Sequence, residues 1–218
     1  MLRMNRIYEK LLTDHFASMR QMAFLSGPRQ SGKTTLAKMA LPDARYFSYD
    51  APHDSLLIQR GGDAIASSLS LSQDEKRANQ GSVIFDEIHK FPRWKNMLKG
   101  FFDVYGDNRR LKIAVTGSAR LNVYKRGGDS LMGRYFLYRL HPLSVGELGS
   151  AEIDTNDIFR KPVDVAPSTV ESLLQFGGFP EPFLNGTMKF KARWHRMRLE
   201  QLFTEDVRDL SRVQDIRQ

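Results

Sequence analysis

Residues 22–34 read Met-Ala-Phe-Leu-Ser-Gly-Pro-Arg-Gln-Ser-Gly-Lys-Thr, an apolar run that ends in a loop bounded by glycines. Residues 27–34 match the phosphate-binding pattern G-x-x-x-x-G-K-[ST] at every fixed position. The run before the loop has the length of a strand, and residues 33–41 after it read as a helix that Pro42 closes. This context disfavours an ordinary glycine-rich turn. The stretch therefore predicts a strand, a phosphate-binding loop and a helix that bind a nucleoside triphosphate.

Each fixed position of this loop suits a triphosphate. Gly27 and Gly32 let backbone N–H groups come close to the phosphates. Lys33 is expected to reach the β- and γ-phosphates, and Thr34 to offer its hydroxyl to Mg²⁺. The helix that follows directs its positive end at the same phosphates. The predicted cofactors are ATP and Mg²⁺, and the predicted nucleotide-binding residues are Gly27, Pro28, Arg29, Gln30, Ser31, Gly32, Lys33, Thr34 and Thr35.

The composition is that of a soluble globular protein. Of the 218 residues, 41% are hydrophobic and 27% are charged, which suffices for one α/β core and a small helical appendage. No apolar stretch approaches the roughly 18 residues that cross a bilayer, and no apolar signal segment follows the N-terminus. The chain has no cysteine, which excludes disulfides, thiolate catalysis and cysteine-bound zinc. We expect a cytoplasmic protein without membrane insertion.

The chain is basic. It has 33 Lys and Arg against 25 Asp and Glu, a net charge of +8. A nucleic-acid surface would explain this excess, and so would the basic lining of a nucleotide site together with ordinary solubility. No zinc-finger pattern, aromatic RNA-binding signature or long block of Lys or Arg accompanies the charge. DNA is therefore a candidate partner whose surface the sequence does not locate.

Short β-type runs alternate with helical segments through residue 140. A helix is predicted over 5–20, and strands are predicted over 22–26, 45–49, 82–85, 112–116 and 135–140. This alternation predicts an α/β fold, a three-layer sandwich around a mostly parallel five-stranded sheet with ligands at the carboxyl ends of its strands. We place a P-loop ATPase core over 1–150, a variable connection over 151–168, and a helical lid or linker over 169–218. Within this last range, the glycines and prolines of residues 177–182 predict a turn.

Two carboxylates follow the apolar run Val83-Ile84-Phe85. Asp86 is expected to hold Mg²⁺ at the edge of the sheet beside the phosphate loop. Glu87 is expected to orient, or accept a proton from, the water that attacks the γ-phosphoryl group. The pair favours hydrolysis over phosphoryl transfer to another acceptor, because a kinase has to exclude water. Two acids in a solvated turn are the alternative.

Two further catalytic candidates come from later segments. The run from Lys112 ends in Thr116-Gly117-Ser118, where a hydroxyl could reach the attacking water, and we favour Ser118 over Thr116. A hydroxyl that caps the next turn is the alternative. Arg134 follows a glycine-rich segment and suits an arginine finger that neutralises transition-state charge. A solvated or strand-capping arginine is equally compatible with the pattern.

Several motifs in this order resemble a known family. They are the phosphate loop GPRQSGKT, then VIFDEIHK, VTGSARL, LMGRYF, LHPLS and the late GGFPE. Together they resemble the prokaryotic AAA+ superfamily ATPases that carry a C-terminal nuclease-like domain of unknown function. The resemblance implies a sheet ordered 5-1-4-3-2. It also implies Lys33 and Thr34 at phosphates and metal, Asp86 and Glu87 as the acid pair, Ser118 as sensor and Arg134 as finger.

Two features depart from that family pattern. His89 stands where such proteins often have Gln, and the sequence stops at Gln218, about where the second domain would begin. We therefore expect a fragment of a longer protein that lacks the C-terminal domain. The adenine contacts stay open, with Arg6 and Tyr8 as candidates.

Three functions compete. The first is a Mg²⁺-dependent ATP hydrolase that couples its nucleotide state to the lid and to an attached module or partner. The absence of N-K-x-D favours ATP over GTP. The second is a slow nucleotide-dependent switch or binding module, DNA-associated or a regulator linked to defence or toxin systems. The third is a kinase that acts on a small molecule or a nucleotide. Homo-oligomerisation is expected if Arg134 acts in trans, and the sequence leaves cis and trans action open.

Overall fold

The structure is a computed structural model that describes residues 6–71, 81–106, 111–117, 131–149 and 164–202. It divides into two compact units. We call the described residues up to His141 the core unit, and Pro142–Gly149 together with the residues from 164 onward the helical unit. Ser118 lies outside the described residues.

The core unit is built on one parallel sheet of five strands. The strands are β1 (Met22–Ser26), β2 (Arg45–Ser48), β3 (Gly81–Asp86), β4 (Leu111–Gly117) and β5 (Tyr135–Arg139). Their order is β2-β3-β4-β1-β5, and all four neighbouring pairs are parallel. The predicted order 5-1-4-3-2 is therefore confirmed, because it is the same order counted from the other edge.

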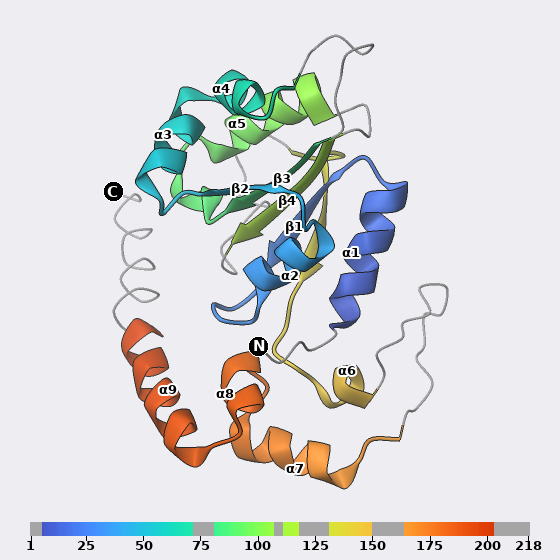
Figure 1. Ribbon diagram of the computed structural model, residues 1–218, viewed down its shortest axis with the longest axis vertical. Coiled ribbons are helices and arrows are strands. Elements are labelled where there is room, and N and C mark those ends of the chain that lie inside the picture. Colours follow the sequence, from blue (N-terminus) through green and yellow to red (C-terminus); the bar gives the residue numbers. More distant parts are fainter. Residues whose placement is uncertain (1–5, 72–80, 107–110, 118–130, 150–163, 203–218) are drawn as a thin grey trace, which may run out of the picture. The chain divides into compact units, whose positions relative to one another are not determined.

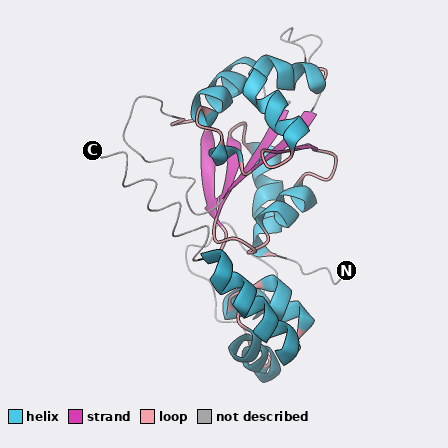
Figure 2. Ribbon diagram, turned by 90° about the vertical axis from the view of Figure 1, so that its left-hand side faces the viewer, coloured by secondary structure: helices cyan, strands magenta, loops and turns pink. Residues whose placement is uncertain are grey.

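Helices cover both faces of this sheet (Figures 1 and 2). One face packs against α1 (Ile7–Ser18) and α2 (Lys33–Ala40). The other packs against α3 (Pro52–Arg60), α4 (Gly62–Ser68) and α5 (Trp94–Phe101). The predicted three-layer α/β fold is confirmed.

Strand β1 shows why the sheet is buried on both sides. All five of its residues are buried. Met22 and Phe24 belong to the apolar cluster under α3, α4 and α5, while Ala23 and Leu25 belong to the cluster under α1 and α2. A strand whose two faces are both covered reads as a continuous apolar run rather than an alternating one. This is why the run that precedes the phosphate loop was readable as a central strand.

Because the strands are parallel, the segments of the predicted site lie together at the carboxyl ends of the strands. The phosphate loop leaves β1 at its carboxyl end, and β3 and β4 end beside it. After β3 the chain forms the short 3₁₀ helix η1 (Ile88–Lys90), and α5 continues into a π-helical turn, η2 (Phe102–Gly106). Ligands of open parallel sheets bind outside the carboxyl ends of the strands, which is where this loop lies.

The helical unit contains α6 (Val145–Gly149), α7 (Pro167–Phe176), α8 (Pro180–Asn185) and α9 (Met188–Gln201). Its two sequence motifs contact each other. The N–H of Leu143 donates to the carbonyl of Gly178 over 2.6 Å, and a Cβ on Gly178 would lie 2.4 Å from the Leu143 carbonyl oxygen. Trp194 donates its indole N–H to Glu181 over 3.2 Å. The LHPLS and GGFPE motifs thus hold this unit together.

Among the described residues, no helix is both long and apolar enough to cross a membrane.

Candidate nucleotide-binding site

The phosphate loop depends on two glycines. Gly27 has φ 154°, and a Cβ there would lie 2.1 Å from the carbonyl oxygen of Leu140. Gly32 has φ 92° and caps the N-terminus of α2 in the left-handed conformation. Side chains rarely adopt such dihedrals, and at Gly27 there is also no room for one. The backbone of the loop therefore takes its shape from glycine at both ends.

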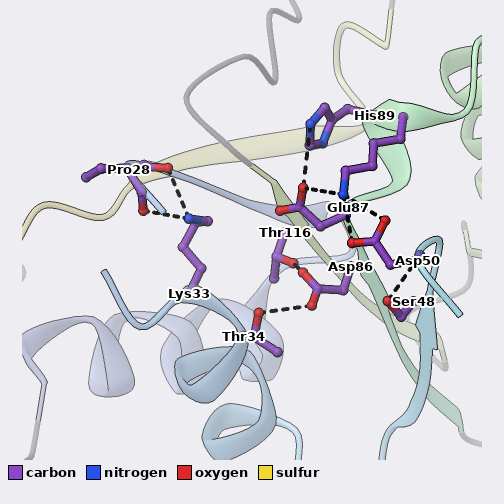
Figure 3. A network of polar contacts seen from close by, with 11 residues as sticks. Pro28, Lys33, Thr34, Ser48, Asp50, Asp86, Glu87, His89 and Thr116 are labelled. Atoms are coloured by element: carbon purple, nitrogen blue, oxygen red, sulfur yellow. Dashed lines mark hydrogen bonds and ion pairs between the residues drawn. The ribbon is translucent and has the colours of Figure 1, made fainter. Parts of the chain in front are cut away.

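Lys33 lies inside the loop, with only 6% of its surface exposed. Its ammonium group donates to the carbonyl of Gly27 over 3.0 Å and to that of Pro28 over 2.7 Å (Figure 3). These bonds direct the positive charge across the loop instead of into solvent. A lysine charge that is held this way lies where a triphosphate would follow the loop backbone.

Asp86 receives three hydroxyl groups. Thr34 donates to Oδ2 over 3.0 Å, Tyr46 donates to the same oxygen over 2.5 Å, and Thr116 donates to Oδ1. Figure 3 shows Thr34 and Thr116 each at one oxygen of this carboxylate. The Thr34 bond connects the start of α2 to the end of β3, so the two predicted halves of the site meet in the structure.

Tyr46 and Thr116 are the members of this cluster that the sequence reasoning did not select. Tyr46 lies within β2 as one of several aromatic strand residues, so its pattern gives no signal. Thr116 is the second-last residue of β4 and is fully buried, and the sequence pattern favours Ser118 over it. Burial, followed by the hydrogen bond to Asp86, raises the pKa of Tyr46, so its hydroxyl remains a proton donor at neutral pH.

Glu87 follows Asp86 in an unusual backbone conformation. Its φ is 55°, in the left-handed region, and its N–H donates to the Thr116 carbonyl over 3.1 Å. Its Oε2 lies 3.6 Å from the Lys90 ammonium nitrogen and 3.8 Å from His89 Nε2. Lys90 also pairs with Asp50 over 2.7 Å (Figure 3). The turn rotates Glu87 off the line of the strand and places its carboxylate within 3.8 Å of the Lys90 ammonium group and the His89 ring.

Arg6 connects the phosphate loop to the segment that follows β5. Its guanidinium donates to the Ser31 carbonyl over 3.0 Å and to the His141 carbonyl over 2.8 Å, and the residue is 9% exposed. Tyr8, the other candidate for adenine contact, donates its hydroxyl to the Arg139 carbonyl over 2.8 Å. Both side chains thus contact the backbone where β5 ends, and Arg6 also contacts the phosphate loop.

Arg134 lies at the amino ends of the strands, whereas the phosphate loop lies at their carboxyl ends. It precedes β5, whose first residue Tyr135 pairs with Met22, the first residue of β1. Its guanidinium donates to both carboxylate oxygens of Asp103, over 2.6 and 3.0 Å. This pairing holds the pKa of Asp103 below its usual range. Within one chain the structure therefore does not bring Arg134 to Lys33 and Asp86.

The oxygen atoms around Asp86 suit Mg²⁺. Mg²⁺ prefers hard oxygen ligands and usually keeps several waters, with one or two protein groups and the substrate phosphates completing its shell. Thr34 and Asp86 offer such a pair. The donor set thus fits an ion that arrives with a nucleotide.

This fold and this loop define a P-loop ATPase domain of the nucleotide-binding α/β class. The family model described as an AAA domain matches residues 19–149, more than half of the chain's 218 residues. The chain belongs to this AAA family. The matched region ends at α6, so it covers the whole sheet and the site.

Two curated relatives match part of the chain. An uncharacterized protein of Mycobacterium tuberculosis is 28% identical over 133 residues, which are 61% of this chain and 28% of that protein. An uncharacterized protein of Mycobacterium bovis matches with the same values. The chain thus spans about a quarter of the length of these relatives.

Two solved structures share the fold. DnaA of Aquifex aeolicus bound to AMPPCP has a TM-score of 0.53 at 14% identity and covers 97% of this chain and 68% of its own. A Walker-type ATPase of Pyrococcus abyssi has a TM-score of 0.50 at 16% identity and covers 94% of this chain and 74% of its own. At these identities the likeness concerns the fold alone.

Proposed function

We propose that this chain binds ATP with Mg²⁺ at the loop Gly27–Thr34 and hydrolyses the γ-phosphate. The observation that carries the proposal is the 3.0 Å hydrogen bond from Thr34 to Asp86, because it joins the phosphate loop to the carboxylate pair. A loop without an acidic strand end beside it would bind phosphate only. Here Glu87 follows Asp86 directly and adds a group that can act on water.

Each residue has a distinct part in this proposal. Lys33 and the loop N–H groups would hold the β- and γ-phosphates, while Thr34 and Asp86 would hold Mg²⁺, Asp86 through a water. Mg²⁺ would neutralise charge that develops on the phosphate oxygens. Glu87 would take a proton from the attacking water or orient it. The AMPPCP that is bound to DnaA supports ATP as the nucleotide.

Arg134 fits this reaction as a group supplied by a second copy. Strand β1 rises about 3.3 Å per residue over five residues, so the edge that carries Arg134 is about 15 Å from the loop. Its own chain cannot use it at the γ-phosphate without leaving that edge. We propose a homo-oligomer in which Arg134 leaves Asp103 and reaches the nucleotide of a neighbour. Ser118 stays a predicted sensor, because it lies outside the described residues.

The route to the helical unit begins at the phosphate loop. The Leu140 N–H donates to the Ser26 carbonyl over 2.7 Å, and Arg6 joins Ser31 to His141. His141 is directly followed by the helical unit, which begins at Pro142. We propose that a change in the loop on binding or losing nucleotide moves this exit and with it the helical unit as a lid. The predicted division into a core, a connection and a lid belongs to this proposal, and the nuclease-like domain stays a prediction.

ATP turnover per subunit over a wide range of protein concentration tests the hydrolase. We expect turnover that rises with concentration in the parent and is lost in both Lys33→Ala and Glu87→Gln. A parent that binds ATP without turnover at any concentration would contradict hydrolysis by this chain. It would favour the slow switch or regulator instead.

Association with DNA is a second candidate function, and α9 is the observation that favours it. This helix carries five basic residues and a single acid, Glu200. Lys189, Arg193 and Arg196 are exposed at spacings of four and three residues, so they form one stripe along the helix. A replication initiator DnaA of the same fold is bound to single-stranded DNA as well as AMPPCP, with a TM-score of 0.52 at 13% identity.

Salt dependence tests the α9 stripe. Replacing Lys189, Arg193 and Arg196 together by Ala should make the fall of log affinity with log salt less steep. The magnitude of the slope should decrease by about 2 to 3, since each phosphate contact contributes roughly 0.7–0.9. The matched control removes the same charge elsewhere, by replacing exposed Lys10, Arg20 and Lys112. Equal losses in both triple variants would indicate general attraction by net charge and contradict a surface on α9.

A further inference from the structure

The Asp86 carboxylate is fixed by a residue that belongs to neither half of the nucleotide site. Thr34 comes from the phosphate loop, and Thr116 comes from the neighbouring strand β4. Tyr46 comes from β2, on the other side of β3, and makes a 2.5 Å hydrogen bond to Oδ2. The carboxylate is thus held from three separate segments.

Strand register explains why a tyrosine performs this contact. Tyr46 pairs with Ile84, and Ser48 pairs with Asp86. Tyr46 therefore lies two residues back along the strand from Asp86, on the same face of the sheet, because side chains alternate with period two. A diagonal neighbour at this separation is within reach of a long aromatic side chain. Serine or threonine at position 46 would be too short.

Tyr46 is also held along its ring. The Lys38 ammonium nitrogen lies 3.8 Å from the ring centroid, and the ring packs against the apolar cluster under α1 and α2. The ring is therefore placed without help from its hydroxyl. The contribution of the hydroxyl can therefore be tested by itself, because a change to Phe removes the hydroxyl and keeps the ring.

We propose that Tyr46 is a positioning residue for the magnesium site, which rests on the proposed function. A carboxylate has about four acceptor positions, two on each oxygen. Thr34 and Tyr46 occupy both positions on Oδ2, and Thr116 occupies one on Oδ1. One position on Oδ1 is left for a water of the Mg²⁺ shell. Without the Tyr46 hydroxyl, one acceptor position on Oδ2 loses its donor and the carboxylate can rotate. The group would then adopt more than one orientation toward the ion.

Tyr46→Phe tests this role through the metal dependence of nucleotide binding. Binding of a fluorescent ATP analogue is titrated with Mg²⁺ and repeated in EDTA, and Mn²⁺ binding to the protein–nucleotide complex is followed by electron paramagnetic resonance. A hydrogen bond to a charged group is stronger than one between neutral groups, and reorientation of the carboxylate recovers part of what its loss removes. We expect the Mg²⁺ concentration for half-maximal effect to rise about tenfold, the Mn²⁺ affinity to fall similarly, and the affinity in EDTA to stay unchanged.

The matched control is Tyr138→Phe. Tyr138 is also half-buried against the α1 and α2 cluster, and its hydroxyl lies 3.0 Å from His15 Nδ1, away from Asp86. It should leave the Mg²⁺ dependence at the parent value. Equal Mg²⁺ dependence in Tyr46→Phe and the parent would overturn the role, and so would an equal loss of affinity with Mg²⁺ and in EDTA, which indicates general damage. A parent that binds no nucleotide overturns the proposed function itself, and this role with it.

Discussion

The polar groups at the carboxyl ends of the parallel strands are more deeply buried than those at the amino ends. We call these two sides of the sheet the carboxyl edge and the amino edge. At the carboxyl edge, Lys33 and Asp86 are 6% and 9% exposed and are enclosed by hydrogen bonds with the loop, α2, β2 and β4. At the amino edge, the side chains of Arg134 and Asp103 are 27% and 43% exposed and pair mainly with each other. Enclosed polar groups fix one geometry, whereas an exposed pair can separate at small cost. The proposed function depends on this difference, because it assigns chemistry within the chain to the carboxyl edge and contact with a second copy to the amino edge.

Among residues that would act within their own chain, the largest effect is expected at the carboxyl edge from Glu87→Gln. Gln keeps the size of Glu but cannot accept a proton, and general base catalysis contributes about 10²–10⁴-fold. We expect turnover to fall about 10³-fold while ATP affinity stays within about threefold of the parent, as measured by steady-state hydrolysis and equilibrium binding. The control is Glu171→Gln on α7, an exposed acid of the helical unit. Turnover that survives in Glu87→Gln would remove the proposed base from this edge.

Gly27→Ala tests how rigid the carboxyl edge is. The added Cβ would lie 2.1 Å from the Leu140 carbonyl oxygen at a φ of 154°, so either the loop or the end of β5 must move. We expect a loss of about 3 kcal/mol in the free energy of unfolding, measured by denaturant titration, together with loss of ATP binding.

Gly100→Ala is the matched control for Gly27. Gly100 lies in α5, has no positive φ, and has nothing within 4 Å of an added Cβ. Here alanine should stabilise by roughly 0.5–1 kcal/mol. Equal effects at both glycines would show that the close approach of Gly27 to Leu140 does not constrain the loop.

Arg6→Met tests the connection from the loop to the exit of β5. It leaves the carbonyls of Ser31 and His141 without this donor, and a lost hydrogen bond to a charged group costs about 1.5–3 kcal/mol before rearrangement. We expect a fall of about 2 kcal/mol in the free energy of unfolding and about tenfold in ATP affinity. Lys10→Met, an exposed change on α1, is the control. Unchanged ATP affinity would separate Arg6 from the nucleotide site.

Local patterns predicted the parts of the site that lie close in sequence. The strand, the loop and the helix after it are read from one continuous stretch, residues 22–41, and β1 occupies the predicted range 22–26. Contacts across strands were missed because they have no local signal. Tyr46 and Asp86 are 40 positions apart, and Thr116 and Asp86 are 30 apart. Only the register of β2, β3 and β4 brings these groups together, and register depends on the folded sheet.

One segment of the helical unit was predicted as a different element. Residues 177–182 read as a turn because of their glycines and prolines, but α8 begins at Pro180. Proline is acceptable in the first turn of a helix, where its missing N–H has no partner to lose. The glycines do form the turn, with Gly177 at φ 78°. The correction is therefore that the second half of the motif is the first turn of a helix.

The smallest effect on stability is expected at the amino edge, from Asp103→Asn and Arg134→Ala. An exposed pair contributes about 0–1 kcal/mol, so both variants should unfold within about 1 kcal/mol of the parent at pH 7. The pKa of Asp103 is depressed from its usual 3.8, so this small stability is present above pH 3.8 and is lost as the pH falls through the depressed value. Denaturant titrations of the parent and of Asp103→Asn should show a small difference in the free energy of unfolding at pH 7 and no difference at about pH 2.

The same two variants should separate in turnover, although they match in stability. Arg134→Ala removes the proposed trans group and should lower turnover per subunit at high protein concentration by about 10³-fold or more, while ATP binding stays at the parent value. Asp103→Asn instead frees the guanidinium from its intrachain partner, so turnover should reach half its maximum at a lower protein concentration. Equal and unchanged turnover in both variants would mean that the amino edge serves only as a surface ion pair. The contrast between the two edges would then concern burial and not function.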